Sequence, residues 1–278
     1  LMALGLVMAG LLWPVLGPLA KWLQWEALLP YSSTWWFKGA VPVGLMLTGA
    51  ALMVRAARGP QAHAMADGPV FGAWVSLLAR PGMLPVLIFI LLFKLGDAAM
   101  GFMVKPFWVD SGFDVDQIGL VSVNVGLGLS IVGGLMGGWY VDRQGIFKGL
   151  WVLGLAQALS NLGYALAAWY VPHAAPGAAV EPSYQIAVYF ASGLESLTGG
   201  LGTGAFMAFL MGITDKQRGT TEYAILSSIF AFSRAVAGWA GGLGVEQMGY
   251  AAFFFLTFWL SFPAYVLLPA VRRMLERE

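Results

Sequence analysis

Apolar segments about the length of a membrane span follow one another along the chain, separated by short polar connectors. A bilayer-spanning helix needs about 20 predominantly apolar residues, so each segment predicts one membrane-spanning helix. The pattern therefore predicts an all-α, polytopic membrane protein, a helical bundle of about eight spans. The predicted spans run roughly over 1–20, 39–54, 82–108, 117–140, 149–170, 184–212, 221–243 and 249–270.

Composition agrees with a lipid environment. The chain is 59% hydrophobic and 10% charged, against roughly 45–50% and about 25% in a soluble domain. Its net charge of +1 argues against a nucleic-acid partner, which requires a clustered basic face. With no cysteine and only His63 and His173, both in connectors, we expect no metal site and no cofactor.

Lysine and arginine in the connectors predict the orientation, because cytoplasmic loops of membrane proteins are enriched in both. One side of the predicted bundle holds Lys21 and Lys38, with Lys105 near its edge. The opposite side is therefore predicted to be cytoplasmic, together with the C-terminus and the 55–81 connector. Its ten basic residues are Arg55, Arg58, Arg80, Arg143, Lys148, Lys216, Arg218, Arg272, Arg273 and Arg277.

The 55–81 connector divides two predicted spans from six. Its first half is small and polar, and its second half places Val70, Phe71, Trp74, Val75 and Leu78 at helical spacing, which predicts a short interfacial helix. Because Leu1 already lies inside an apolar segment, we expect a chain truncated at its N-terminus. The predicted domains are 1–54, the last two spans of one bundle; 55–81, a cytoplasmic linker; and 82–278, a six-span bundle.

Four ionisable residues lie within the predicted spans, near the middle of the bilayer: Lys94, Asp97, Glu195 and Arg234. Each would cost roughly 2.5–3.5 kcal/mol if it faced lipid at the centre, so all four are expected to face the bundle interior or a watery cavity. They could line a transport pathway, or Lys94 and Asp97 could form an intrahelical ion pair that holds the fold. We expect Glu195 to carry the proton, and Arg234 to be its switchable partner or a ligand of a substrate anion.

Polar uncharged residues occur at similar depths and suit sugar hydroxyls and amides. They could bind substrate, or they could hold neighbouring helices together by hydrogen bonds. The glycine run "GGLGTG" (199–204) predicts close helix packing rather than a phosphate loop. The polar candidates are Asn124, Gln157, Asn161, Ser196 and Thr198, with Ser160 and Thr203 beside them.

The connector "GGWYVDRQGIFKG" (137–149) resembles the G-x-x-x-D-R-x-G-x-x-K loop of the major facilitator superfamily. Its position between the second and third spans of a six-span unit is where that superfamily carries it, although the positive-inside bias alone can also produce Asp-Arg-x-Gly. The resemblance implies a gating loop. The matching residues are Gly138, Asp142, Arg143, Gly145 and Lys148.

A closer resemblance covers most of residues 80–270. The motifs "FKLGDA", "GFDVDQIGLV", "LGLAQALSNLGYALAA", "GLESLTGGLGTGAFMAFLMG" and "AILSSIFAFSRAVAGWAGG" look like the second half of AmpG-type muropeptide permeases. The resemblance implies a major-facilitator bundle in the bacterial inner membrane that imports anhydro-muropeptides by proton symport. It implies that the protein is a transporter and not an enzyme, with membrane lipid, protons and a sugar-peptide substrate as partners.

Alternative functions remain open at this point. Val123 stands where the AmpG-type family usually has a lysine, which leaves room for a different polar or anionic solute, such as that of the related acetyl-CoA transporters. A non-transporting sensor or scaffold is a second alternative. A magnesium-dependent membrane transferase is disfavoured, because Asp110, Asp114 and Asp116 are predicted to lie on the outer side. A channel is disfavoured because no short re-entrant filter segment is visible.

Overall fold

The computed structural model describes residues 44–45, 47–49, 51–52, 55, 71–175, 177–215 and 219–276. The chain divides into two compact units, Leu1–Pro81 and Gly82–Glu278. The predicted span 1–20 and most of the 55–70 linker lie outside the described residues. The described residues of the predicted span 39–54 are helical. The assignment of these units to two transporter bundles stays a prediction.

Helix α4 (Phe71–Ala79) confirms that the second half of the 55–81 connector is a short helix. It buries Ala73, Leu77 and Leu78, while Trp74 and Val75 are half-buried. The apolar side chains follow helical spacing, as the sequence indicates.

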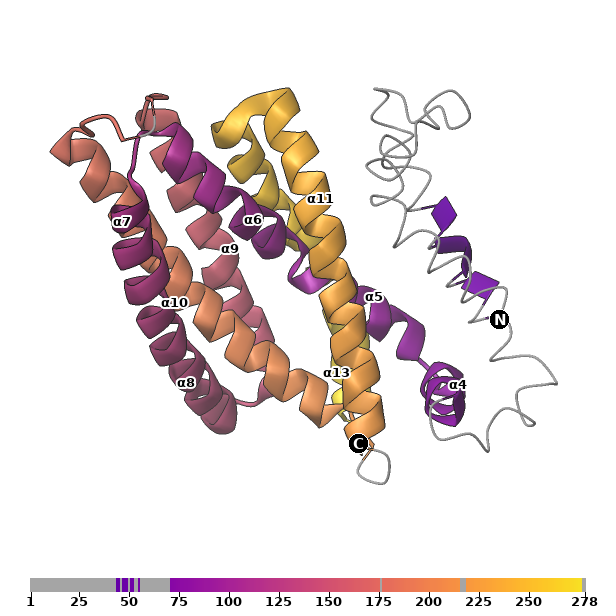
Figure 1. Cartoon of the computed structure of the whole chain (residues 1–278). Helices are drawn as coiled ribbons and strands as arrows, with labels where there is room; N and C mark the ends of the chain where they lie inside the picture. Colours follow the sequence, from indigo (N-terminus) through magenta and orange to yellow (C-terminus); the bar gives the residue numbers. More distant parts are fainter. Residues whose placement is uncertain are drawn as a thin grey trace, which may run out of the picture. The chain divides into compact units, whose positions relative to one another are not determined.

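The second unit is built from long helices that correspond to the six predicted spans (Figure 1). Described residues outside the helices form connectors, with one isolated β-bridge between Ser111 and Ala174. The chain is thus the all-α helical bundle that the hydrophobic pattern predicts. Its helices are α5 (Met83–Phe93), α6 (Leu95–Asp110), α7 (Val115–Gln117), the π-helix η1 (Ile118–Val125), α8 (Gly126–Gln144), α9 (Ile146–Tyr170), α10 (Pro182–Gly212), α11 (Gly219–Leu260), α12 (Phe262–Val266) and α13 (Leu268–Leu275).

Three predicted spans differ in detail from the observed helices. The span predicted over 82–108 is interrupted at Lys94, which separates α5 from α6. The spans predicted over 221–243 and 249–270 are joined within α11, which is kinked at Gly249. Gly249 has φ +77°, a left-handed conformation that glycine adopts without the steric penalty of other residues. At Gly249 the chain passes from the first of these two predicted spans into the second.

The second span of this unit, predicted over 117–140, begins with a capping box at Asp114. Its side chain accepts a hydrogen bond of 2.6 Å from the Gln117 backbone N–H, and the Gln117 side chain accepts one of 3.2 Å from the Asp114 N–H. Such reciprocal bonds satisfy backbone donors that the first turn of a helix leaves free. The helix then continues through the π-helical segment η1 into α8.

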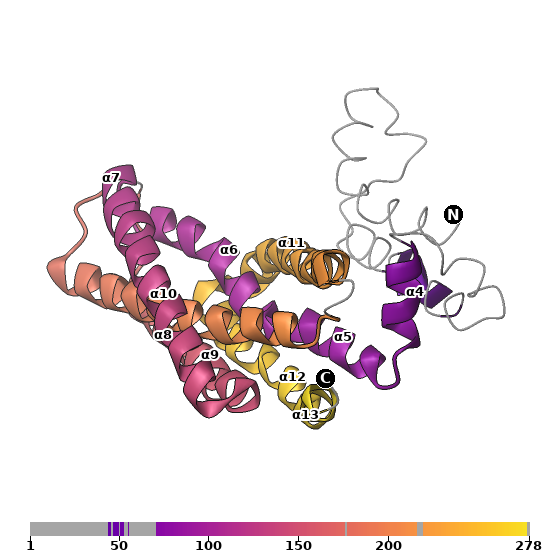
Figure 2. The ribbon, with the colours of Figure 1, turned by 90° about the horizontal axis from the view of Figure 1, so that it is seen from below.

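Four stretches in the described residues are long and apolar enough to cross a membrane: Met83–Asp110, Val115–Gln144, Ile146–Tyr170 and Gly219–Val266. The last of these contains the predicted span 221–243 and most of the predicted span 249–270. Helix α10 has 31 residues but is not among the four, because glycines and polar residues lower its hydropathy. Helix α10 packs extensively against α8 and α9, and α11 packs against α6 and α9 (Figures 1 and 2).

Glycines set the close approach of α8 and α10. A Cβ atom at Gly133 would collide with the Leu197 carbonyl oxygen, and one at Gly200 would collide with the Ser130 carbonyl oxygen. A Cβ at Gly204 would lie 2.6 Å from the Gly134 carbonyl oxygen. Only residues without a side chain allow two backbones to pack this closely. This confirms that the glycine run 199–204 serves helix packing.

Candidate functional site

The break at Lys94 creates the centre of the site. Helix α5 ends at Phe93 and α6 begins at Leu95, so the Lys94 side chain leaves from a non-helical residue between them. Asp97 lies in the first turn of α6, where the positive end of the helix dipole stabilises a negative charge. The sequence places both charges in one span; it does not reveal the interruption that separates them.

Lys94 is buried and its ammonium group has acceptors for all three N–H donors. It donates to Gln157 Oε1 at 2.9 Å, to Asp97 Oδ2 at 3.2 Å and to the Gly199 carbonyl oxygen at 3.5 Å. These contacts join the α5–α6 break to α9 and α10. The ion pair between Lys94 and Asp97 that the sequence allows is formed, and Lys94 is held in place from three sides.

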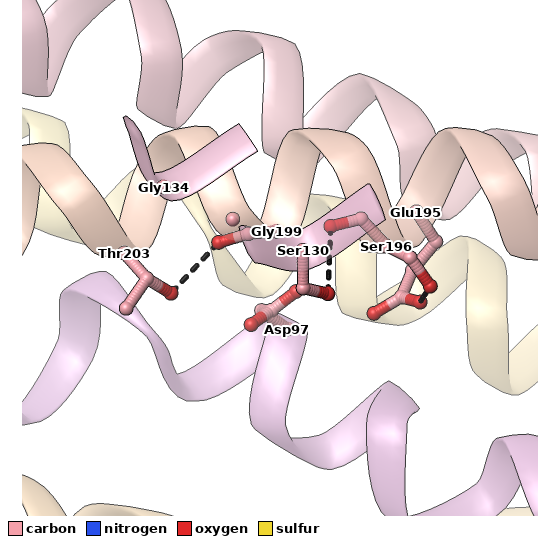
Figure 3. Close-up of a pocket in the computed structure, with 8 residues that line it drawn as sticks. Asp97, Ser130, Gly134, Glu195, Ser196, Gly199 and Thr203 are labelled. Atoms are coloured by element: carbon pink, nitrogen blue, oxygen red, sulfur yellow. Dashed lines mark hydrogen bonds between the residues drawn. The ribbon is translucent and has the colours of Figure 1, made fainter. Parts of the chain in front are cut away.

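A cavity of about 250 Å³ lies beside this ion pair, between α6, α8 and α10 (Figure 3). Asp97 enters it from α6, and α10 contributes Glu195 and Ser196. In Figure 3 the Asp97 side chain points toward the stretch of α10 that carries Gly199. The full lining is Asp97, Ser130, Gly134, Glu195, Ser196, Gly199, Gly200 and Thr203.

Glu195 is half-buried and lies along α10 next to the other charges. Its Oε2 accepts a 3.3 Å hydrogen bond from the Ser196 hydroxyl, and a Cβ at Gly199 would lie 3.7 Å from its Oε1. Asp97, Lys94 and Lys105 interact with it electrostatically. Between described residues, the ion pairs within 4.0 Å are Lys94–Asp97 and Arg272–Glu276, and neither includes Glu195.

Two polar atoms around Lys94 are buried without a hydrogen-bond partner: Asp97 Oδ1 and Gln157 Nε2. Buried polar groups are normally hydrogen-bonded, and each exception calls for a physical explanation. Asp97 also lines the cavity. Asp97 Oδ1 is therefore a buried acceptor next to the cavity whose hydrogen-bonding capacity is unused.

The structure brings five of the predicted pathway and substrate residues together: Lys94, Asp97, Gln157, Glu195 and Ser196. Arg234 is not among them. It is exposed, and its guanidinium carbon lies 5.9 Å from the centre of the Phe230 ring. The expected pair between Glu195 and Arg234 is therefore not formed in this conformation, because the α11 side chain is directed elsewhere.

Four of the remaining polar candidates lie outside the cavity, whose lining includes Thr203. Asn161 is buried and donates to Thr257 at 3.3 Å, linking α9 to α11. Thr198 and Ser160 bond back to carbonyl groups of their own helices. Asn124 is exposed on η1. The structure thus favours interhelical or local bonding for the first three of these residues.

The predicted gating loop is the tight turn between α8 and α9. Gly145 has φ +86°, which explains a glycine at this position. Asp142 and Lys148 are exposed, and the Arg143 guanidinium carbon lies 4.6 Å from the centre of the Trp139 ring. Gly138 lies where α10 approaches: its backbone nitrogen would be 3.1 Å from a Cβ at Gly204. A gating role for this loop stays a prediction.

The sequence does not single out Lys105 as a site residue, because its place near the end of a span indicates an ordinary interfacial lysine. In the structure it is half-buried and donates a hydrogen bond to Ser122 of η1. Its distance in sequence from Lys94, 11 residues or about three turns, could have placed both on one face of the span.

These features define an integral membrane protein with a charged cavity inside an apolar helical bundle, the architecture of a membrane permease. The chain is 35% identical over 192 residues to the anhydromuropeptide permease of Escherichia coli strain K12, covering 69% of this chain and 37% of that permease. No family model matches the chain.

Two further relatives come from Rickettsia and are named as candidate transporters. The chain is 30% identical over 205 residues to AmpG 4 of Rickettsia conorii, covering 70% of this chain and 47% of the relative. It is 25% identical over 191 residues to AmpG 1 of Rickettsia felis, with 69% and 41% covered. The match thus spans less than half the length of these relatives. It confirms the resemblance to AmpG-type permeases that the motifs predict.

Proposed function

We propose that this protein is a secondary active transporter that imports peptidoglycan-derived anhydro-muropeptides across the bacterial inner membrane by proton symport, with its C-terminus in the cytoplasm. The observation that carries the proposal is the cavity between α6, α8 and α10, which places Asp97 and Glu195 inside an otherwise apolar bundle. Intramembrane ionisable residues mark substrate and proton pathways in transporters. The relatives named as anhydromuropeptide permease and AmpG support the substrate class.

Glu195 is the proton carrier in this proposal, and Lys94 with Asp97 is a fixed pair. A carboxylate that binds and releases a proton during each cycle needs a cationic environment that can change. Asp97 is bonded to a lysine whose three donors are all used. Glu195 accepts a hydrogen bond from Ser196 and has no cation within 4.0 Å in the described residues. Its surroundings can therefore change with helix motion.

The test is Glu195→Gln in the protein expressed from its complete reading frame and reconstituted in sealed vesicles. Uptake of a radiolabelled anhydromuropeptide is driven by a pH gradient, and exchange of the same compound is measured without a gradient. We expect Glu195→Gln to reduce gradient-driven accumulation at least tenfold, while exchange without a gradient continues. Asp97→Asn serves as the comparison: if it abolishes accumulation and Glu195→Gln does not, the proton carrier is Asp97.

A second candidate, transport of another anionic solute, is favoured by one observation. Val123 is 48% exposed on η1, and the resemblance to AmpG-type permeases implies a lysine at this position. A different set of charges near η1 would change the solute that is recognised. Uptake of acetyl-CoA but not of anhydromuropeptide would favour this candidate, and binding without accumulation would favour a sensor.

A further inference from the structure

We propose that Lys105 and Ser122 form an anion subsite of the pathway, which binds a carboxylate or phosphate group of the transported solute. This inference rests on the proposed transport function and adds a residue that fixes the charge and orientation of the solute. Lys105 lies on α6 and Ser122 on η1, and the lysine ammonium donates to the serine hydroxyl.

The ammonium group of Lys105 is under-used in comparison with that of Lys94. Lys94 has three acceptors, including a carboxylate. Lys105 is half-buried, its one observed acceptor is a neutral hydroxyl, and no carboxylate of the described residues lies within 4.0 Å of it. A cation within a membrane span is costly unless it is paired or hydrated. An incoming anion would supply the missing partner.

The position of Lys105 orients an anionic solute. It follows Asp97 by eight residues, which is about 12 Å along α6, and lies toward the end of that helix that carries Asp110. Asp97 and Glu195 line the cavity and repel an anion, whereas Lys105 attracts it. Lys105 and Lys94 also act electrostatically on Glu195, so all four charges share one local field. The anionic group of the solute is therefore directed to Lys105 and its neutral part to the cavity.

The segment η1 connects this subsite to Glu195. Ser122 precedes Gly126 by four residues, and a Cβ at Gly126 would lie 2.9 Å from the Ser196 hydroxyl that donates to Glu195. π-Helical segments within α-helices occur frequently at functional sites. An anion bound by Lys105 and Ser122 thus acts on a segment that leads into Gly126, which packs against Ser196, the residue that donates to the proposed proton carrier. Arg234 is no alternative in this conformation, since its guanidinium lies over Phe230 on α11.

The test measures binding by equilibrium dialysis of the purified full chain with two pairs of labelled probes. One pair is an anhydromuropeptide with free carboxylates and the same compound with carboxamides. The other is acetyl-CoA and its neutral counterpart S-acetylpantetheine. We expect the wild type to prefer the anionic member of one pair by about 10- to 100-fold, because a hydrogen bond to a charged group contributes about 1.5–3 kcal/mol. Lys105→Gln should remove this preference.

Lys105→Arg keeps the positive charge and should keep the preference for the anion. Arg273→Gln removes one positive charge, as Lys105→Gln does, but at an exposed position on α13, and it should also leave the preference unchanged. If Lys105→Gln does not fold, Ser122→Ala decides, with an expected loss of about 3- to 10-fold in the preference. A preference for acetyl-CoA alone that depends on Lys105 supports the subsite and contradicts the muropeptide proposal. The subsite is overturned if the wild type prefers neither anion, or if the preference survives Lys105→Gln or, in its place, Ser122→Ala.

Discussion

The ammonium nitrogen of Lys94 lies 2.9 Å from Oε1 of Gln157, a residue 63 positions further along the chain on a different helix. This bond fixes a charged group at the break between α5 and α6 and ties it to α9. It also decides the role of Gln157, whose oxygen is occupied by the lysine. Gln157 Nε2 is buried and has no hydrogen-bond partner in the structure.

Lys94→Gln is expected to destabilise the protein by about 3 kcal/mol, because removing one partner of a buried ion pair leaves the other charge uncompensated. The side chain of Asp97, its partner, is only 16% exposed. The measurement is the free energy of unfolding in detergent, with denaturation followed by circular dichroism. Lys94→Gln combined with Asp97→Asn should recover part of the loss. Additive losses in the double variant would contradict a coupled pair.

Gly200→Ala is expected to destabilise the protein by about 1–3 kcal/mol, the range typical of overpacking. The new methyl group would meet the backbone carbonyl of Ser130, which cannot rotate away as a side chain could. Gly128→Ala on the facing helix is the matched control, since its Cβ would have no heavy atom within 4 Å. That change should be neutral or slightly stabilising, because alanine favours helix more than glycine does. Thermal unfolding of both variants would compare them directly; equal transition temperatures would contradict the packing role.

Much of the fold could be predicted from the sequence because lipid imposes a simple rule: each span must satisfy its own backbone and present apolar side chains. The helices from α5 to α11 accordingly match the apolar segments. The break at Lys94 could not be predicted, since no proline or glycine stands at that position and apolar residues continue on both sides. Next to the break, Gly96 packs against the Thr257 carbonyl oxygen, a tertiary contact that the sequence of this span does not reveal.

The candidate site was predictable only in part. Charges within spans identify Lys94, Asp97 and Glu195, because an ionised group in lipid demands an interior position. The same rule also predicts Arg234 at the site, which is wrong for this conformation. Depth in the bilayer can be estimated from sequence, but the direction in which a side chain points from its helix depends on neighbouring helices. The rule does not identify Lys105, because a lysine near the end of a span can reach water by extending its side chain and so needs no interior position.

Asp114→Ala is expected to lower stability by about 1 kcal/mol, as is typical for loss of an N-cap side chain. The side chain accepts the Gln117 N–H at 2.6 Å, and without it this donor at the start of the second span loses its partner. Asp116→Ala, two residues further on and also exposed, removes a charge but not the cap bond. It should have a clearly smaller effect. Urea midpoints in the same detergent would distinguish the two, and a larger effect of Asp116→Ala would show that charge rather than capping matters.

Asp142→Asn is expected to reduce uptake several-fold in the protein expressed from its complete reading frame, while stability changes by less than about 0.5 kcal/mol, as for surface substitutions without fixed contacts. Asp142 is exposed, so any role in gating must come from a contact that forms in another conformation. Gly145→Ala provides the contrast: its φ of +86° disfavours any side chain, and a stability loss of about 1–2 kcal/mol is expected from the left-handed backbone. Uptake rates in vesicles, corrected for the amount of protein inserted, together with unfolding free energies test both. Unchanged uptake by Asp142→Asn would leave the loop as a basic flank of the membrane and no gate.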